Sequence, residues 1–335
     1  MRQPTVTAEA QPPAPTRLMA ENLRMSYGPR LALRGLSFSL KAGRILGFLG
    51  PNGAGKTTAI RILTTTLAPS AGTFNVDGIS SDEPDLIRRR IGVLPESLGF
   101  PKQMTGVEYL AFFGQLYGLS QQEARARAVV LLADVGLQQR AMSRIGTYSH
   151  GMRQRLGIAR ALVNDPRVVF LDEPTLGLDP RGQQELLALI QNIARERGTS
   201  VVLCSHLLSE IEGICDDVVI LNLGQVVAAG SVAEVLGQAG SNMIQVRVDP
   251  ASVAKAREVL EKAPRVERVT VTDELSGQLA VELAALADDA TPPGPLARNA
   301  LLQALIRAKV PVVSFGFAGN RLQDLFLQVT DEAIS

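Results

Sequence analysis

The segment Gly50-Pro51-Asn52-Gly53-Ala54-Gly55-Lys56-Thr57 decides the fold, because its spacing of glycines, lysine and threonine is that of a phosphate-binding loop. An apolar run at residues 44–50 predicts a buried strand before it, and residues 56–67 predict a helix after it. Glycines let backbone N–H groups surround a phosphate at angles that a Cβ would obstruct, and the helix start adds positive potential. A strand, loop and helix of this kind predict a nucleotide site.

Three side chains at the end of the loop are expected to complete that site. Lys56 would hold the β- and γ-phosphates of a bound nucleotide. Thr57 would bind Mg²⁺ through its hydroxyl, and Thr58 can reach the α-phosphate. The cofactors that the loop implies are ATP and Mg²⁺.

A second apolar strand is expected at residues 168–172, and two adjacent carboxylates, Asp172 and Glu173, lie at its end. Alternation along a strand would place these two side chains on opposite faces of the sheet. We expect Asp172 to hold the Mg²⁺ shell through water and Glu173 to act as general base on an attacking water. Carboxylate pairs are usually just solvated, so it is the phosphate loop upstream that gives this pair a chemical meaning.

The pattern along the chain indicates two folded domains. Residues 18–237 alternate β-rich and helical segments, which predicts an α/β domain with a parallel sheet, and residues 97–166 within it favour a helical lobe. A Gly-containing linker at 237–241 leads to an α+β domain at 242–335 with the order of a split β-α-β unit. Residues 1–17, rich in proline, are expected to form a disordered tail.

Composition narrows the class of protein. The 335 residues are 46% hydrophobic, but no apolar run is long enough to predict a membrane span. Lys and Arg number 34 against 33 Asp and Glu, so the net charge of +1 gives no reason to expect nucleic acid as a partner. Two cysteines without a C-x-x-C spacing are interpreted as reduced core thiols of a cytosolic protein.

Further motifs carry a family resemblance. Tyr148-Ser149-His150-Gly151-Met152 precedes the acidic strand, Leu178-Asp179 follows it, and Cys204-Ser205-His206 ends the next apolar run. With the phosphate loop and with Tyr27 ahead of it, this order resembles the nucleotide-binding subunit of an ABC transporter. The resemblance covers residues 18–237. It implies a P-loop NTPase fold with a parallel-sheet core, an antiparallel β subdomain and a helical lobe.

The resemblance also implies roles for these residues. Tyr27 is expected to stack on adenine, and His206 to contact the γ-phosphate and the attacking water as a catalytic residue beside Glu173 and Lys56. ATP would be held between two copies of the chain arranged head to tail. The signature residues Ser149, Gly151 and Met152 and the D-loop residue Asp179 would then face the ATP of the partner. For Ser149 there is also a local reason, since a serine there can cap the following helix.

Two positions depart from the family pattern. Glu96 replaces the usual glutamine of the loop after the strand at 90–94, where a carboxylate can still bind Mg²⁺ or a water although phosphate would repel it. His150 stands where glycine is common in the signature motif. Its imidazole either points away from the nucleotide, where it changes little, or points inward, where it alters γ-phosphate binding with pH.

Residues 104–110, 149–155 and the closing helix at 321–330 are similar to the ATPases of ABC-2-type exporters. That similarity implies a separate transmembrane permease as partner and a location at the cytoplasmic face of the membrane. The segment 96–117 should contact the permease, and Phe112, Phe113 and Tyr117 would either line that groove or belong to the core. Two other functions stay open: an ABC ATPase acting on ribosomes or DNA, and a nucleotide-sensing regulator with little turnover.

Overall fold

The computed structural model describes residues 14–97, 99–205, 207–238, 243–284, 295–317 and 322. Contacts divide the chain into two compact units, residues 1–229 and 230–335. The division falls ahead of the linker expected at 237–241, so that α8 (Val232–Gln238) belongs with the second unit. Because the two units are separate bodies, each is described by itself.

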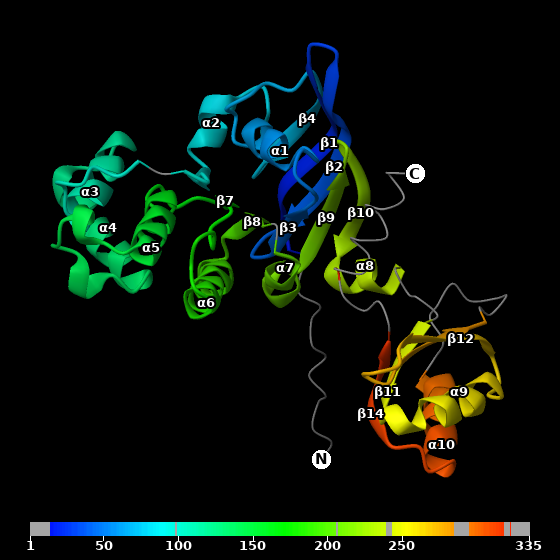
Figure 1. The fold of residues 1–335 in the computed structure, drawn as a ribbon. Helices are drawn as coiled ribbons and strands as arrows, with labels where there is room; N and C mark the ends of the chain where they lie inside the picture. The colour runs from blue at the N-terminus through cyan, green and yellow to red at the C-terminus, as the bar shows by residue number, and fades with distance from the viewer. Residues whose placement is uncertain are drawn as a thin grey trace, which may run out of the picture. The chain divides into compact units, whose positions relative to one another are not determined.

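Two sheets form the body of the first unit (Figure 1). An antiparallel sheet has the order β2-β1-β4-β5, and a six-stranded sheet has the order β10-β9-β3-β8-β7-β6. In the six-stranded sheet, β3 pairs in parallel with β8 and β9, and β7 pairs in parallel with β6 and β8. The strands are β1 (Thr16–Tyr27), β2 (Arg30–Lys41), β3 (Ile45–Leu49), β4 (Ala71–Val76), β5 (Ile79–Ser80), β6 (Ile91–Leu94), β7 (Val168–Asp172), β8 (Ser200–Cys204), β9 (Asp217–Asn222) and β10 (Gln225–Ser231).

Figure 1 shows α1 on one face of the six-stranded sheet and α6 and α7 on the other. The central strands are buried throughout, as their continuous Val, Ile, Leu and Phe runs predict, with Phe48 and Phe170 inside the core. Cys204 and Cys215 are both buried free thiols, as expected. The helices of this unit are α1 (Lys56–Leu63), α2 (Pro84–Arg88), α3 (Gly106–Leu116), α4 (Gln121–Asp134), α5 (His150–Ala161), α6 (Pro180–Arg197) and α7 (Leu208–Ile214), with short 3₁₀ turns at Gln138–Arg140 and Ile145–Thr147.

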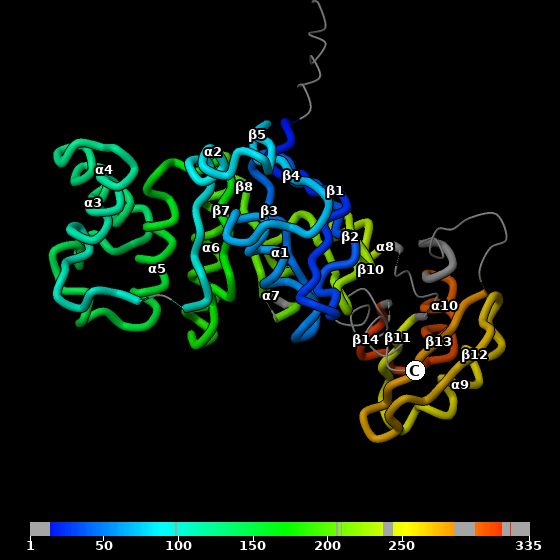
Figure 2. Tube along the Cα trace, turned by 90° about the horizontal axis from the view of Figure 1, so that it is seen from above, coloured from blue at the N-terminus to red at the C-terminus, as the bar shows by residue number. Residues whose placement is uncertain are grey.

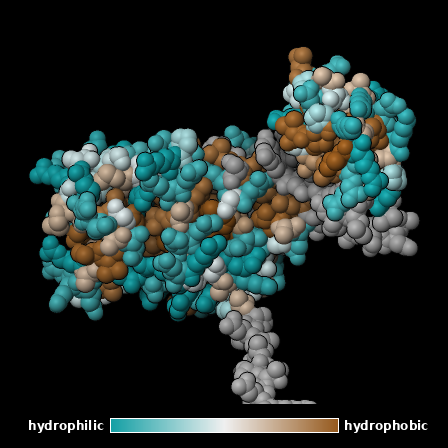
Figure 3. Space-filling model, turned by 90° about the horizontal axis from the view of Figure 1, so that it is seen from below, coloured by the Kyte–Doolittle hydropathy of each residue, from teal (hydrophilic) through white to brown (hydrophobic). Residues whose placement is uncertain are grey.

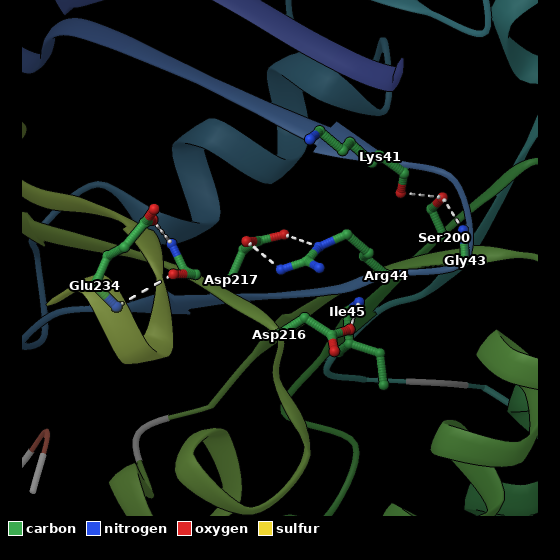
Figure 4. A network of polar contacts seen from close by, with 9 residues as sticks. Lys41, Gly43, Arg44, Ile45, Ser200, Asp216, Asp217 and Glu234 are labelled. Atoms are coloured by element: carbon green, nitrogen blue, oxygen red, sulfur yellow. Dashed lines mark hydrogen bonds and ion pairs between the residues drawn. The ribbon is translucent and has the colours of Figure 1, made fainter. Parts of the chain in front are cut away.

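A polar network fixes the amino-terminal edge of the parallel strands (Figure 4). Arg44 binds Asp217 through two hydrogen bonds of 2.6 and 2.7 Å, which join the start of β3 to the start of β9. The neighbouring Asp216 accepts from the N–H of Ile45 at 2.9 Å. The hydroxyl of Ser200 donates to the carbonyl of Lys41 at 3.0 Å and brings in the start of β8. A bidentate pair fixes the relative orientation of its two partners as well as stabilising them. These contacts therefore help to fix the register of β3, β8 and β9 at this edge.

The helices α3, α4 and α5 gather at one end of the first unit, beyond β6 and β7 (Figures 1 and 2). Both α3 and α4 begin with a capping box, Thr105 with Glu108 and Ser120 with Glu123, which explains why these starts can be predicted from sequence. The carboxyl end of α5 sits directly on β6. A Cβ built on Gly92 would come within 1.9 Å of the carbonyl oxygen of Ala161, so only glycine permits this contact.

The second unit carries an antiparallel sheet of order β12-β13-β11-β14 with two helices. Along the chain its elements run strand, helix, strand, strand, helix, strand, which is the split β-α-β arrangement expected from the sequence. A separate core lies between sheet and helices and includes Ile244, Leu260, Leu279 and Leu305. The elements are β11 (Met243–Val248), a 3₁₀ turn at Pro250–Ser252, α9 (Val253–Glu261), β12 (Val266–Asp273), β13 (Gln278–Leu283), α10 (Pro295–Arg307) and β14 (Val312–Phe317).

Within the part of the chain that the structure describes, no helix combines the length and the apolar character that crossing a bilayer requires. The closing helix expected at 321–330 lies outside the described residues except for Leu322.

Candidate functional site

A cleft of about 450 Å³ opens at the carboxyl-terminal edge of the six-stranded sheet, opposite the edge held by Arg44 and Asp217. It contains most of the residues that the sequence singles out. The lining residues are Tyr27, Arg30, Ala32, Pro51, Asn52, Gly53, Ala54, Gly55, Lys56, Thr57, Thr58, Arg61, Glu96, Asp172 and Glu173. Side chains that are far apart in the sequence therefore meet around the phosphate loop.

The backbone of the loop has the form that a phosphate requires. Gly55 precedes α1 with φ of +106°, and a Cβ on it would lie 2.8 Å from the carbonyl oxygen of Ala32. Gly50 is packed as closely, since a Cβ added to it would lie 2.4 Å from the carbonyl oxygen of Leu221. No side chain caps the first turn of α1, so its N–H groups face the cleft unpaired by a capping residue. A glycine-bounded concavity with free N–H donors fits an anion such as the phosphates of ATP.

Lys56 is half-buried at the start of α1, and its ammonium stays within the loop. Nζ donates to the carbonyl of Gly50 at 2.5 Å and to that of Pro51 at 3.3 Å. The positive charge is thus held over the loop by two backbone oxygens. It is positioned where it can exchange these acceptors for phosphate oxygens.

Three carboxylate residues, Glu96, Asp172 and Glu173, line the same cleft as this lysine. Asp172 ends β7, and Glu173 directly after it has φ of +49°, a left-handed conformation that is uncommon for a residue with a side chain. The predicted placement of Asp172 and Glu173 on opposite faces is therefore wrong, because the strand ends at Asp172 and the chain turns, so that both side chains line the cleft. Backbone strain of this kind often accompanies function, since the surrounding structure must hold it in place.

The surroundings of Asp172 in the cleft disfavour a negative charge on its carboxyl group. Burial is the main cause that raises the pKa of Asp172 to about 6; the negative charges of Glu173 and Glu96 contribute to the rise, and the positive charges of Lys56 and Arg61 oppose it. A divalent cation would relieve this repulsion. No group of three His, Cys, Asp or Glu among the described residues forms a metal site alone. The donor set of Thr57 and Asp172 fits Mg²⁺ that arrives with a nucleotide, because Mg²⁺ binds through one or two carboxylates together with phosphates and waters.

Two cations in the cleft are absent from the sequence-based expectations. Arg30 begins β2, and its guanidinium lies 3.9 Å from where a Cβ on Gly53 would be. Arg61 projects from the second turn of α1. Arg30 could have been found, because the two-residue turn after Tyr27 pairs Tyr27 with Arg30 across the hairpin and so carries both to the same cleft.

The signature residues lie apart from this cleft. A second hollow of about 600 Å³ is lined by Ser149, His150, Gly151, Met152 and Asp179 among others. Ser149 caps α5 by accepting from the N–H of Met152 at 3.2 Å, as expected. Asp179 caps α6 in the same way, accepting from Gly182 at 3.0 Å. Two helix starts therefore face one hollow, separate from the phosphate loop of the same chain.

Two expectations on histidines have different outcomes. His206 lies outside the described residues, so its predicted catalytic role stays a prediction. His150 is exposed, and its Nε2 lies 2.8 Å from the carbonyl oxygen of Leu176. Its imidazole therefore contacts the loop that follows Glu173.

Asp172→Asn is expected to stabilise the nucleotide-free protein at neutral pH. The pKa of Asp172 is raised from 3.8 to about 6 on folding, so the ionised carboxylate destabilises the folded state. This destabilisation is absent below about pH 4, grows as the pH rises, and is nearly complete above about pH 6. Because the side chain is partly solvated, we expect a gain on the order of 1 kcal/mol, roughly 2–4 °C in melting temperature. Thermal unfolding at pH 8 and pH 4.5 checks this, and an equal shift at both pH values would contradict it.

Comparison with known proteins agrees with this architecture. Residues 33–176 match the family model of the ABC transporter. The chain is 36% identical over 321 residues to the daunorubicin/doxorubicin resistance ATP-binding protein DrrA of Streptomyces peucetius, covering 94% of this chain and 93% of that protein. It is 36% identical over 228 residues to the linearmycin resistance ATP-binding protein LnrL of Bacillus subtilis, covering 68% and 73%.

Solved structures give the same result. The ATP-binding cassette MJ0796, in a dimeric post-hydrolysis state bound to ADP and Pi, is 26% identical, with a TM-score of 0.58 over 64% of this chain and 98% of that one. An ATP-binding subunit of an ABC transporter is 31% identical with the same TM-score, over 65% and 91%. Fold and site together define a P-loop ATPase of the ATP-binding cassette class. The chain belongs to the family of ABC transporter ATP-binding proteins, and the expected ATP-binding, ATP-hydrolysing function is confirmed.

Proposed function

We propose that this protein hydrolyses Mg-ATP as a head-to-tail dimer and so energises export by a separate transmembrane permease at the cytoplasmic face of the membrane. The observation that carries the proposal is the cleft in which the phosphate loop faces Asp172 and Glu173. The names of the relatives support export, since DrrA and LnrL are both described as ATP-binding proteins of antibiotic resistance.

In this proposal the cleft binds one ATP. Tyr27 stacks on the adenine, and Pro51 to Thr58 surround the phosphates, with Lys56 on the β- and γ-phosphates. Thr57 and Asp172 hold Mg²⁺, with Glu96 as a further oxygen donor nearby. The metal, when bound, would neutralise charge that develops on the phosphates during transfer.

Glu173 is proposed to accept a proton from the water that attacks the γ-phosphate. Its left-handed backbone turns the carboxylate into the cleft beside Asp172. His206 would orient the same water. Arg30 adds a positive charge on the Tyr27 side of the loop, where it can offset the charge of the phosphates.

The proposed dimer follows from the distribution of the site. Ser149, Gly151 and Asp179 line a hollow of their own, so they can meet ATP only if that ATP is held by another copy of the chain. The positive end of α5, where Ser149 caps the first turn, suits a γ-phosphate presented from outside. The dimeric state of the MJ0796 cassette supports this arrangement.

Substitutions at Ser149 test the dimer. Asp and Asn both cap helices well, so Ser149→Asp and Ser149→Asn should leave α5 intact and differ only in charge. The aspartate would repel the partner's γ-phosphate, so we expect it to dimerise at least about tenfold more weakly than the asparagine variant in Mg-ATP. Sedimentation over a concentration series measures this, and equal dimerisation of the two variants would count against the head-to-tail model.

The permease is proposed to dock on the helical lobe. A groove of about 880 Å³ is lined by residues of the α3 end, α4 and the segment after α5, including Leu116, Tyr117 and Val130. Leu116 and Tyr117 are 65% and 48% exposed. Figure 3 shows hydrophobic side chains on this end of the first unit. Exposed apolar side chains gathered at a groove indicate a surface that a partner covers.

The three aromatic residues expected at this surface divide between two roles. Phe113 is half-buried and packs on Tyr109, with ring centroids 5.0 Å apart, and under the guanidinium of Arg160. Phe112 is 50% exposed and lies beside the groove residues on α3. Phe113 therefore belongs to the lobe, whereas Phe112 and Tyr117 are available for docking.

Adjacent valines on α4 provide a matched test of docking. Val129 and Val130 are 54% and 55% exposed, but only Val130 lines the groove. Val130→Glu would place a carboxylate under the permease in an apolar part of the groove and should weaken its attachment about tenfold or more, whereas Val129→Glu should not. Coexpression with an ABC-2-type permease and quantification of membrane-bound protein measures the difference. Equal attachment of both variants would exclude this groove as the docking site.

A further inference from the structure

The side chain of His150 connects two segments that are 26 residues apart in the sequence. It is the first residue of α5, next to the capping Ser149, and its Nε2 lies 2.8 Å from the carbonyl oxygen of Leu176. Because a carbonyl can only accept, the imidazole must donate from Nε2. The contact therefore requires a side chain with a donor at that reach, which glycine at the same position cannot supply.

The segment that accepts this bond is itself ordered by turns that begin at Glu173. The N–H of Leu176 donates to the carbonyl of Glu173 at 3.2 Å, and that of Leu178 donates to Thr175 at 3.1 Å. Beyond them Asp179 caps α6. The imidazole thus contacts the middle of a short, internally bonded loop that runs from the proposed general base to the start of α6.

Packing between the two segments leaves little space around this contact. A Cβ on Gly177, which has φ of +78°, would come within 3.2 Å of His150 Nε2. A Cβ on Gly151 would lie 3.4 Å from Cδ2 of Leu178. The first turn of α5 and the loop 176–178 therefore pack closely against each other at this contact.

We propose that His150 is a positioning residue, which fixes the start of α5 to the loop after Glu173 within one subunit. The inference rests on the proposed head-to-tail dimer, in which Ser149 and Gly151 meet the partner's ATP. The hydrogen bond to Leu176 then makes the placement of these two residues depend on the segment that carries the general base. In each chain, the position of Ser149 and Gly151 toward the partner's ATP would thus depend on the segment that follows that chain's own Glu173.

The test compares donors at position 150. His150→Gln keeps an N–H at a similar reach, whereas His150→Leu and His150→Ala remove it. We expect the Leu and Ala variants to lose about three- to tenfold in kcat, the worth of one hydrogen bond, with KM and binding of a fluorescent ATP analogue to the isolated subunit unchanged and the melting temperature lowered by no more than about 2–4 °C. The Gln variant should recover most of the lost kcat.

A second measurement separates this inference from the proposed dimer. In a Glu173→Gln background with Mg-ATP, His150→Leu should raise the dimer dissociation constant about three- to tenfold, and His150→Gln should restore it. If Glu173→Gln alone stays monomeric, the proposed dimer fails. If it dimerises and His150→Leu dimerises and turns over as well as the native residue, or if Gln is as impaired as Leu, the positioning role of His150 is overturned.

Discussion

Glu173→Gln is expected to lower kcat roughly 10²–10⁴-fold, the usual worth of a general base, while the protein still binds Mg-ATP. The side chain keeps its size and one oxygen, so the turned backbone at φ of +49° and the cleft around it should persist. What is lost is the basic oxygen that takes the proton. Because bound ATP is then no longer cleaved, the nucleotide-bound dimer should accumulate.

Phosphate release and light scattering in Mg-ATP measure the two effects together. A suitable control is Glu21→Gln, which makes the same chemical change on β1 at an exposed position outside the cleft. We expect this control to turn over ATP normally. Turnover of Glu173→Gln within tenfold of the native protein would exclude Glu173 as the base.

Lys56→Ala should abolish measurable turnover by removing the phosphate ligand itself. Its ammonium lies within 2.5 Å of the carbonyl of Gly50, held over the loop where the phosphates bind. Losing charge-assisted bonds of this kind costs about 1.5–3 kcal/mol, so Kd for ATP should rise roughly 10- to 150-fold. The same loss leaves two loop carbonyls without their donor, which weakens the cradle further.

Titration with a fluorescent ATP analogue, with and without Mg²⁺, measures the affinity directly. Lys102→Ala provides the comparison, since Lys102 is an exposed lysine outside the cleft. Native affinity in Lys56→Ala would mean that the loop N–H groups alone hold the phosphates, and the assigned role of Lys56 would be wrong.

The sequence predicts those parts of the molecule that depend on local physics. Capping boxes at Thr105 and Ser120 mark two helix starts, and continuous apolar runs mark the buried strands. The end of α1 is an instructive difference. It was expected near Leu67 but falls at Leu63, because the hydroxyl of Thr64 bonds back to Ile60 at 2.8 Å and Thr65 takes φ of +60°.

What could not be predicted depends on tertiary contacts. The turn at Glu173 reverses the alternation that a strand pattern implies, and the neighbouring strand helps to fix it, because the carbonyl of Cys204 accepts from the N–H of Glu173 at 3.0 Å. The direction of the His150 side chain depends on Leu176, which the sequence does not mark as a neighbour. Motifs therefore identify the residues of the cleft, while their relative placement comes from the fold.

The close contact of Gly92 with Ala161 means that α5 could transmit a displacement from one nucleotide site to the other in the proposed dimer. The carboxyl end of α5 packs on β6, and Arg160 stabilises this contact by donating to the carbonyl of Val93 at 2.9 Å. The strand β6 leads to Glu96, which would lie beside the ATP bound by the same chain. The amino end of α5 would touch the partner's ATP. In the proposed dimer this helix of 12 residues, about 18 Å long, would connect the two nucleotide sites, so that a change at one site would be transmitted to the other through α5 itself.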